Sequence, residues 1–395
     1  MNILYITLSE PRLSERGIYP DLVRALRRAS HEITIVYAAS PARYKKTELI
    51  RENGVNILRV VVGENFNVGL IKKGINTLKL EPLLKLAIGR FLKDKSFDLC
   101  IYATPPVTFA GVVDYCRKKF GVRTFLMLKD IFPQNAVDIG LFKKGSPVYR
   151  VFKSKERRLY ALSDAIGCMS EGNLRYLKEH EPWLEDKRLS VFPNTIEIRE
   201  PENGALAKRQ PKEAVSFVFG GNLGKPQAVE WLISAIGDRR LKERRDIVFY
   251  MIGTGSEKEK AAKAAKELPN LIYREALPPD EYERLMAGMD VGIISLDHRF
   301  TIPNYPSRIL SYMNEKKPVL ACTDEVTDIK ELVVEKARCG LWVSSDDRDG
   351  FVKAVSTLAE NAGLRREMGE RGFEYLKENF DVELSVRLLE RMINV

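Results

Sequence analysis

Short apolar strands alternate with amphipathic helices along this chain, and the alternation occurs twice. The first series begins with a hydrophobic strand at Met1–Leu8, a helix near Tyr19–Ala29 and the β-branched strand His31–Tyr37. Strand, helix and strand in this order are typical of a parallel sheet that is covered by helices. A second series begins at Val215. The pattern therefore predicts an α/β protein with two doubly wound parallel sheets.

A polar stretch separates the two series. Apolar residues are sparse from Glu197 to Glu213, which predicts an interdomain linker. At 395 residues the chain is long enough for each domain to bury a core of its own. The expected parts are, in order, a first domain, a linker, a second domain and a final helix, at residues 1–196, 197–213, 214–380 and 381–395.

Charge and composition limit the partners of the chain. The formal net charge is +10, which favours an acidic partner such as nucleic acid, an anionic membrane surface or a phosphorylated substrate. Three histidines and five widely spaced cysteines without a CxxC pair argue against a metal site and for a reduced, cytoplasmic protein. The N-terminus has the pattern of a strand rather than of a signal peptide. No apolar run approaches the roughly 20 residues that span a bilayer.

A basic, apolar-rich segment lies at Asn67–Lys95. It carries seven cations against two carboxylates, interleaved with leucine, isoleucine and phenylalanine. Such a helix either packs on its own domain with solvated charges or lies on anionic lipid, where Lys72, Lys73 and Lys79 would make contact. A second basic cluster at Lys143–Arg158 favours the lipid surface, and both alternatives stay open.

Two candidate positions in the first series follow the ends of strands. Gly17 lies in the loop after the first strand, where parallel sheets bind ligands, although no GxGxxG fingerprint is present. Lys129 and Asp130 follow the strand Arg123–Leu128 directly. This edge of a parallel sheet is where such folds place their chemistry, but Asp130 would also fit as a simple cap of the next turn.

Three segments of the second series also follow predicted strands. The sequence GGNLGK predicts a glycine-rich turn at Gly220–Lys225, and Gly253-Thr254-Gly255 ends another strand. Glycines let a backbone approach a ligand closely, and a lysine adds positive charge. In the third segment, NYPSRILSYM, Ser307 is expected to cap a helix that carries Arg308 at its start. Together these segments suit a nucleotide diphosphate, while an ordinary capped helix with a surface arginine is the alternative for the third alone.

In this order the segments resemble the family 4 retaining glycosyltransferases of GT-B fold, over nearly the whole chain. The branch they are most similar to transfers N-acetylated amino sugars, such as N-acetylfucosamine, in capsule and O-antigen assembly. The resemblance implies two Rossmann-like domains that face each other across a cleft, with the nucleotide sugar in the second, the acceptor in the first and a final helix that returns to the first. The matching segments are KDIFPQNAVDIGLFKKGS, VFPNTIE, FVFGGNLGK, MIGTGSE, PNLIYREALPPDEYERLMAGMDVGIISL and YPSRILSYMNEKKPVL.

The resemblance also implies residue roles. Gly17 and Ile18 would contact the acceptor, and Lys129, Asp130 and Arg308 would be catalytic. Many relatives have His-Asp at the position of Lys129 and Asp130. Many members also carry two glutamates separated by seven residues, where this chain has Pro303 and Ser311. The implied donor-binding residues are Gly221, Asn222, Lys225, Gly253, Gly255, Ala276, Leu277, Tyr305, Ser307 and Arg308.

We therefore expect a retaining, metal-independent transferase that uses no cofactor. It would move a sugar from a UDP-sugar to a polyprenyl-diphosphate-linked saccharide, as a peripheral protein on the cytoplasmic face of a membrane and without a nucleic-acid partner. A nucleotide-sugar epimerase or hydrolase of the same fold is an alternative, but such enzymes use paired acidic and histidine residues that the strand-end loops of the first series lack. A non-catalytic nucleotide binder is a second alternative that the charge allows.

Overall fold

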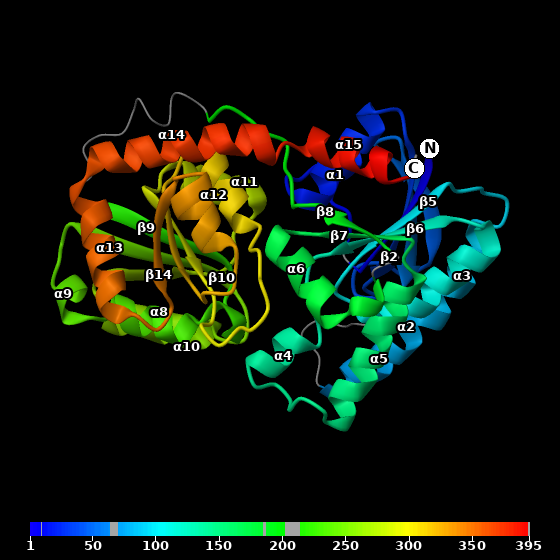
Figure 1. The fold of residues 1–395 in the computed structure, drawn as a ribbon, viewed down its shortest axis with the longest axis horizontal. Helices are drawn as coiled ribbons and strands as arrows, with labels where there is room; N and C mark the ends of the chain where they lie inside the picture. The colour runs from blue at the N-terminus through cyan, green and yellow to red at the C-terminus, as the bar shows by residue number, and fades with distance from the viewer. Residues whose placement is uncertain (9, 64–69, 185–186, 202–213, 394–395) are drawn as a thin grey trace. The chain divides into compact units, whose positions relative to one another are not determined.

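The computed structural model describes residues 1–8, 10–63, 70–184, 187–201 and 214–393 (Figure 1). The chain forms two compact units. Unit 1 comprises Met1–Thr195 and Val382–Val395, and unit 2 comprises Ile196–Asp381. Most of the expected linker, residues 202–213, lies outside the described residues.

Unit 1 is built on an eight-stranded sheet with the strand order β3-β4-β2-β1-β5-β6-β7-β8. All neighbouring strands are parallel except β3 and β4, which pair as an antiparallel hairpin. The strands are β1 Asn2–Thr7, β2 Glu32–Ala39, β3 Glu48–Glu52, β4 Val55–Val61, β5 Leu99–Ala103, β6 Arg123–Leu128, β7 Ala165–Cys168 and β8 Arg188–Val191.

Strand β3 was absent from the sequence prediction. Its residues ELIRE are largely polar and lie at the edge of the sheet, so they show no apolar pattern. The turn that joins β3 to β4 is Asn53-Gly54, in which both residues have positive φ. An Asn-Gly pair is a strong signal for a two-residue hairpin, and it could have revealed this strand.

Helices cover both faces of the unit 1 sheet. Helices α1 and α15 pack against each other on one face (Figure 1), where Val382, Val386 and Leu389 of α15 enter the core. An ion pair of 2.9 Å between Arg28 and Glu383 also joins these helices. The helices of unit 1 are α1 Ile18–Arg28, α2 Leu70–Phe91, η1 Val107–Phe109, α3 Ala110–Phe120, α4 Gln134–Asp138, α5 Pro147–Leu162, α6 Glu171–His180, η2 Pro182–Leu184 and α15 Val382–Ile393.

Unit 2 is built on a six-stranded parallel sheet with the order β11-β10-β9-β12-β13-β14. Its strands are β9 Val215–Asn222, β10 Ile247–Thr254, β11 Leu271–Arg274, β12 Val291–Ser295, β13 Val319–Thr323 and β14 Gly340–Ser344. Its helices are η3 Lys225–Gln227, α8 Val229–Ile236, α9 Arg239–Lys242, α10 Lys258–Glu267, α11 Pro279–Ala287, α12 Arg308–Asn314, η4 Glu331–Lys336, α13 Arg348–Glu360 and α14 Ala362–Asn379. The predicted α/β class with two doubly wound parallel sheets is confirmed.

The glycine-rich turn is shorter than the sequence predicts. Strand β9 continues through Gly220, Gly221 and Asn222, so these three residues belong to the sheet. The parallel register pairs Gly221 with Gly253 of β10. A Cβ at Gly253 would lie 1.8 Å from the carbonyl oxygen of Gly221, and one at Gly255 would lie 2.3 Å from that of Leu223. Glycine is therefore needed at both positions because two backbone segments approach closely there, whether or not a ligand binds.

We expect Gly253→Ala to lower the free energy of unfolding of unit 2 by about 3 kcal/mol, because the new Cβ would meet a backbone oxygen and φ is +149°. Gly363→Ala is the matched control, since nothing lies within 4 Å of its Cβ position in α14 and alanine favours a helix. Urea unfolding checks both. Equal stability of the two variants would contradict the role given to Gly253.

Candidate functional site

A half-buried cation, Arg308, whose Nη1 atom is fully buried and has no partner among the described residues, marks the candidate site in unit 2. The guanidinium carbon of Arg308 lies 4.5 Å from the centroid of the Phe219 ring. Its Nη1 is buried and has no hydrogen-bond partner within the described residues. Burial lowers the pKa of Arg308. Because burying an unpaired charge is costly, this arrangement suits an anion that enters from outside the protein.

Three neighbours shape the space around Arg308. Gly221 has no side chain, and a Cβ there would lie 3.2 Å from Nη2 of Arg308. The Tyr282 hydroxyl lies against Gly220, where a Cβ would be 2.0 Å away. The Tyr312 hydroxyl lies 3.2 Å from the carbonyl oxygens of Val218 and Ile293. Burial raises the pKa of both tyrosines, so neither hydroxyl supplies a negative charge at neutral pH.

Phe219, Tyr282 and Tyr312 were not predicted as site residues. They come from β9, α11 and α12. Tyr312 lies four residues after Arg308 on α12, and this helical spacing could have shown it. No such spacing connects Phe219 or Tyr282 to Arg308. The parallel sheet brings β9 and β12 together, and α11 and α12 flank β12 in the chain. The site is therefore a product of the crossover connections.

The helix start at Ser307 differs from the prediction. Ser307 already has helical backbone angles, φ −62° and ψ −19°, and its side chain makes no capping hydrogen bond. A capping side chain requires non-helical backbone angles at its own residue, and Ser307 lacks them. Helix α12 begins at Arg308 and has only seven residues. The guanidinium, rather than a capped helix end, is therefore the source of positive charge.

The other predicted donor residues are distributed along the strand ends of unit 2. The side-chain amide of Asn222 donates to Oε1 of Gln227 at 3.0 Å. Lys225 is exposed at the start of η3 and has no ion pair among the described residues. Together with Gly221 they form a continuous segment beside Arg308, because Gly221 adjoins the guanidinium.

The remaining predicted donor residues have other surroundings. Ala276 is exposed and Leu277 is half-buried, in the segment after β11. Next to them Glu275 pairs with Lys258 at 3.2 Å. Tyr305 is buried, with its ring 6.4 Å from that of Phe380. The structure therefore gives Tyr305 a packing role.

A second candidate site lies in unit 1, where Lys129 and Asp130 follow β6. The Thr104 hydroxyl accepts from the backbone N–H groups of Lys129 at 3.1 Å and Asp130 at 3.3 Å, and it donates to the Asp130 carbonyl. Helix α4 is preceded by Pro133 and has no side-chain cap, so the alternative role of Asp130 as a cap of this helix is wrong.

Burial shifts the pKa of both ionisable groups of this pair. It raises the pKa of Asp130 to about 6 and lowers the pKa of Lys129 to about 7. Burial also raises the pKa of Tyr19 to about 12, with a smaller contribution from Asp130. Tyr19 and Thr104 were not predicted here, and the signal that could have shown them was their position after β1 and β5 at the same sheet edge. Perturbed pKa values near neutrality are typical of groups that transfer protons.

The predicted acceptor residues Gly17 and Ile18 open α1, next to Tyr19. Gly17 has φ +146°, and its N–H donates to the carboxylate of Asp21 at 3.2 Å. Asp21 is buried and also pairs with Arg24. The electrostatic effect of Asp130 on Tyr19 places the start of α1 near the Lys129–Asp130 segment.

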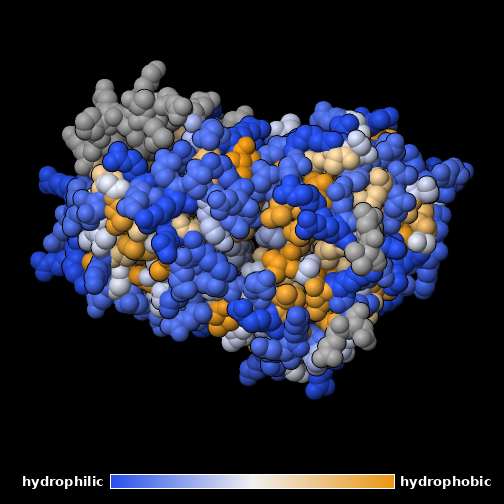
Figure 2. All heavy atoms as spheres, turned by 45° about the horizontal axis from the view of Figure 1, so that its top comes forward, coloured by the Kyte–Doolittle hydropathy of each residue, from blue (hydrophilic) through white to orange (hydrophobic). Residues whose placement is uncertain are grey.

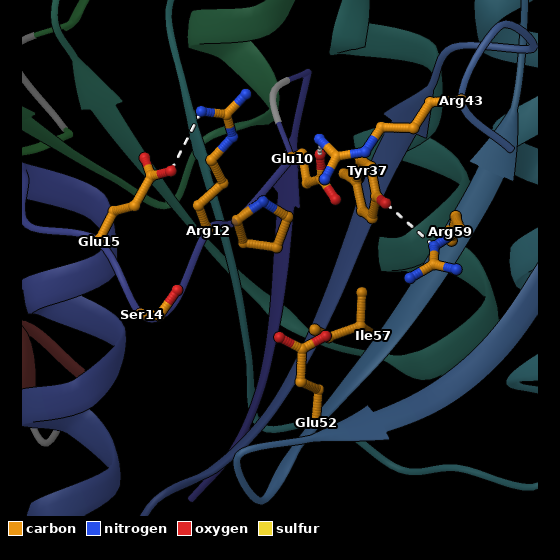
Figure 3. Close-up of a pocket in the computed structure, with 10 residues that line it drawn as sticks. Glu10, Arg12, Ser14, Glu15, Tyr37, Arg43, Glu52, Ile57 and Arg59 are labelled. Atoms are coloured by element: carbon orange, nitrogen blue, oxygen red, sulfur yellow. Dashed lines mark hydrogen bonds and ion pairs between the residues drawn. The ribbon is translucent and has the colours of Figure 1, made fainter. Parts of the chain in front are cut away.

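A polar cavity of about 370 Å³ opens beside the same loop (Figure 3). Arg12 faces Glu15 at 3.1 Å, and Nε of Arg59 donates to the Tyr37 hydroxyl at 3.1 Å. Arg43 pairs with Glu10. These arginines have protein partners, so the cavity offers donors and acceptors without an unpaired cation. This lining suits a hydroxyl-rich ligand better than a phosphate.

Of the predicted membrane contacts, Lys79 is exposed on α2, and the side chains of Lys72 and Lys73 lie outside the described residues. No helix in the described part of the chain is long and apolar enough to cross a membrane. Figure 2 shows hydrophobic patches scattered over a mostly hydrophilic face. Within residues 1–8, 10–63, 70–184, 187–201 and 214–393 no group of three or more histidine, cysteine, aspartate or glutamate side chains could hold a metal ion.

Two family models match most of the chain between them. Residues 20–200 match "Glycosyltransferase Family 4", and residues 214–361 match "Glycosyl transferases group 1". The boundary between the matches coincides with the polar stretch that joins the two strand–helix series. Both halves of the chain therefore match models of glycosyltransferase domains.

Two curated relatives are transferases by name. The chain is 26% identical over 247 residues to "Probable glycosyltransferase WbjE" of Pseudomonas aeruginosa, across 60% of each chain. It is 24% identical over 222 residues to "Lipopolysaccharide core biosynthesis glycosyltransferase LpsE" of Rhizobium meliloti, across 56% of this chain and 61% of that protein. The match thus spans about three fifths of the length of each of these relatives.

A solved structure shares the fold from end to end. The E. coli protein described as "Trehalose-6-phosphate" and bound with UDP-2-fluoro glucose superposes with a TM-score of 0.73 at 12% identity. The superposition covers 100% of this chain and 99% of that one. The expected transferase class and GT-B fold are confirmed. From its two family matches and its complete fold, the chain is a family 4 glycosyltransferase of GT-B fold.

Proposed function

We propose that the chain transfers an N-acetylated amino sugar from a UDP-sugar to a polyprenyl-diphosphate-linked saccharide, with retention of the anomeric configuration. The product would be part of a surface polysaccharide. The observation that carries the proposal is the guanidinium of Arg308, whose Nη1 is buried and has no partner among the described residues. A nucleoside diphosphate supplies the missing negative charge.

The two units divide the substrates between them. In unit 2, Gly221 lies against the Arg308 guanidinium, and these two residues together with Lys225 are proposed to hold the donor diphosphate. In unit 1, the start of α1 and the Lys129–Asp130 segment are proposed to hold the acceptor. The lipopolysaccharide role in the name of LpsE and the UDP-sugar bound to the E. coli protein support this choice of substrates by analogy.

The barrier to transfer is departure of the diphosphate from the anomeric carbon. Arg308 and Lys225 stabilise the negative charge that grows on the leaving oxygen. The acceptor oxygen forms its bond on the face from which the diphosphate leaves, so the configuration is retained. The departing phosphate oxygen takes the acceptor proton, and Asp130 orients the acceptor hydroxyl. No protein nucleophile is required.

We expect UDP to raise the melting temperature of the purified protein by several degrees, with and without EDTA, because a ligand that binds only the folded state stabilises it. GDP, ADP and dTDP at equal concentration serve as controls for the base. No shift with any of the four nucleotides would contradict the proposed donor site. A shift with UDP that EDTA removes would contradict a metal-independent site.

A further inference from the structure

Three exposed large apolar side chains lie close together in the sequence of unit 1, in the loop before α5 and on α5 itself. Figure 1 shows the place of α5 in the fold. Leu141, Val148 and Val151 are 61%, 50% and 55% exposed. Val148 and Val151 are three residues apart on the helix, so they lie on the same outward side. Exposed apolar groups that cluster in this way mark a contact surface.

Unpaired cations lie among these apolar side chains. The sequence from Ile139 to Lys155 contains five cations and no carboxylate. Lys143, Lys144 and Arg150 are exposed, and neither they nor Lys155 has an ion pair among the described residues. Lys153 pairs with Glu156 and Glu181, and its side chain is only 27% exposed.

The inner side of the segment is firmly packed. Phe152 lies 4.9 Å from Phe132 and 6.4 Å from Phe142, measured between ring centroids. Ser146 caps α5 by accepting from the N–H of Tyr149 at 3.3 Å. The outward residues Leu141 and Val151 are the chain neighbours of Phe142 and Phe152, so the aromatic cluster holds them in place. A preformed surface loses little conformational entropy when it binds.

We infer that this surface binds an anionic lipid bilayer. We define the α5 surface as the following outward residues: Leu141, Lys143, Lys144, Val148, Arg150, Val151 and Lys155. Apolar side chains enter the boundary between headgroups and acyl chains, while lysines and arginines around them meet anionic headgroups. A nucleic-acid partner would use the charges but would not require the exposed leucine and valines that lie among them.

The position of the α5 surface connects it to the candidate acceptor site. Phe132, which belongs to the aromatic cluster beneath the surface, follows Asp130 by two residues. A bilayer bound here would lie close to the segment proposed to hold a lipid-linked acceptor. The link between the α5 surface and a lipid-linked acceptor rests on the proposed function. Lipid binding itself can be measured without any substrate.

The test is co-sedimentation of the full chain with vesicles of phosphatidylcholine alone or with 30% phosphatidylglycerol. We expect binding to the anionic vesicles only, weakened by 0.5 M NaCl. Lys143→Gln with Lys144→Gln should lower the partition coefficient about 30-fold. Val148→Ser with Val151→Ser should lower it about 10-fold. The matched controls in unit 2, Lys242→Gln with Lys266→Gln and Val326→Ser with Val334→Ser, also change exposed residues and should bind as the unchanged protein does.

Three results would overturn the inference. They are no binding to anionic vesicles, equal loss in the α5 and control variants, and retention of a soluble polyanion such as heparin without vesicle binding. The UDP thermal shift of every variant reports folding and tests the donor site separately. A UDP shift without vesicle binding refutes the α5 surface alone, and vesicle binding without any nucleotide shift refutes the proposed donor site alone.

Discussion

Arg308→Ala is expected to lower kcat/KM by about 100- to 1,000-fold, because it removes a preorganised cation from the leaving diphosphate. The Arg308 guanidinium lies over the Phe219 ring and its buried Nη1 has no partner among the described residues, so its charge is available to the ligand. The UDP-induced rise in melting temperature should disappear in the same variant. Release of UDP from the donor in the presence of acceptor membranes measures the rate.

Arg308→Lys separates charge from geometry. Lysine keeps the positive charge but lacks the planar fork and the stacking face, so we expect only partial activity. Arg240→Ala is the control, since Arg240 is exposed in unit 2 and pairs with Asp238 and Asp349. Wild-type turnover in Arg308→Ala, with an intact fold, would rule out the proposed donor site.

Asp130→Asn is expected to reduce turnover about 100-fold, because the neutral amide orients the acceptor hydroxyl less well than the ionised carboxylate does. The pKa values predict the pH profile of the unchanged enzyme. Asp130 becomes ionised above about pH 6, and Lys129 loses its charge above about pH 7. The rate of the unchanged enzyme should therefore rise through about pH 6 and fall through about pH 7. In Asp130→Asn the rise near pH 6 should be absent.

The free energy of unfolding should depend on pH through the same two groups, with slopes of opposite sign. Because the Asp130 pKa is raised on folding, the folded chain binds more protons between its ordinary value of 3.8 and about 6, and this contribution to stability declines as pH rises. Because the Lys129 pKa is lowered, the unfolded chain binds more protons between about 7 and 10.5, and stability rises with pH there. Melting temperatures across this range separate unfolding from the catalytic limbs.

Asp114→Asn provides the control for Asp130→Asn, because the Asp114 carboxylate pairs with Lys118 and Arg158, away from the strand-end site. It should leave the pH profile unchanged. An acid limb that persists in Asp130→Asn would show that another group titrates near pH 6 and would remove Asp130 from the mechanism.

The sequence failed where a local pattern was weak or where geometry overrode it. Strand β3 is largely polar and lies at the edge of the sheet, so its sequence shows no apolar periodicity. The Gly220–Asn222 segment looks like a turn, yet pairing with β10 keeps it extended. Ser307 is a favourable capping residue by type, but its backbone is already helical, so the hydroxyl makes no capping bond. In each case long-range pairing or backbone geometry outweighed residue preference.

The sequence by itself determined the two parallel sheets, since the alternation of apolar strands and amphipathic helices is local along the chain. It also indicated Arg308, which opens a segment with helical spacing, and the Lys129–Asp130 pair, which follows an apolar strand. Only the tertiary structure showed that Phe219 and Tyr282 surround Arg308 and that Thr104 holds the backbone of Asp130. The physical reason is that parallel strands require long crossovers, which bring together residues with no fixed spacing. Burial, which sets the pKa values of Lys129 and Asp130, likewise arises only when those distant segments pack.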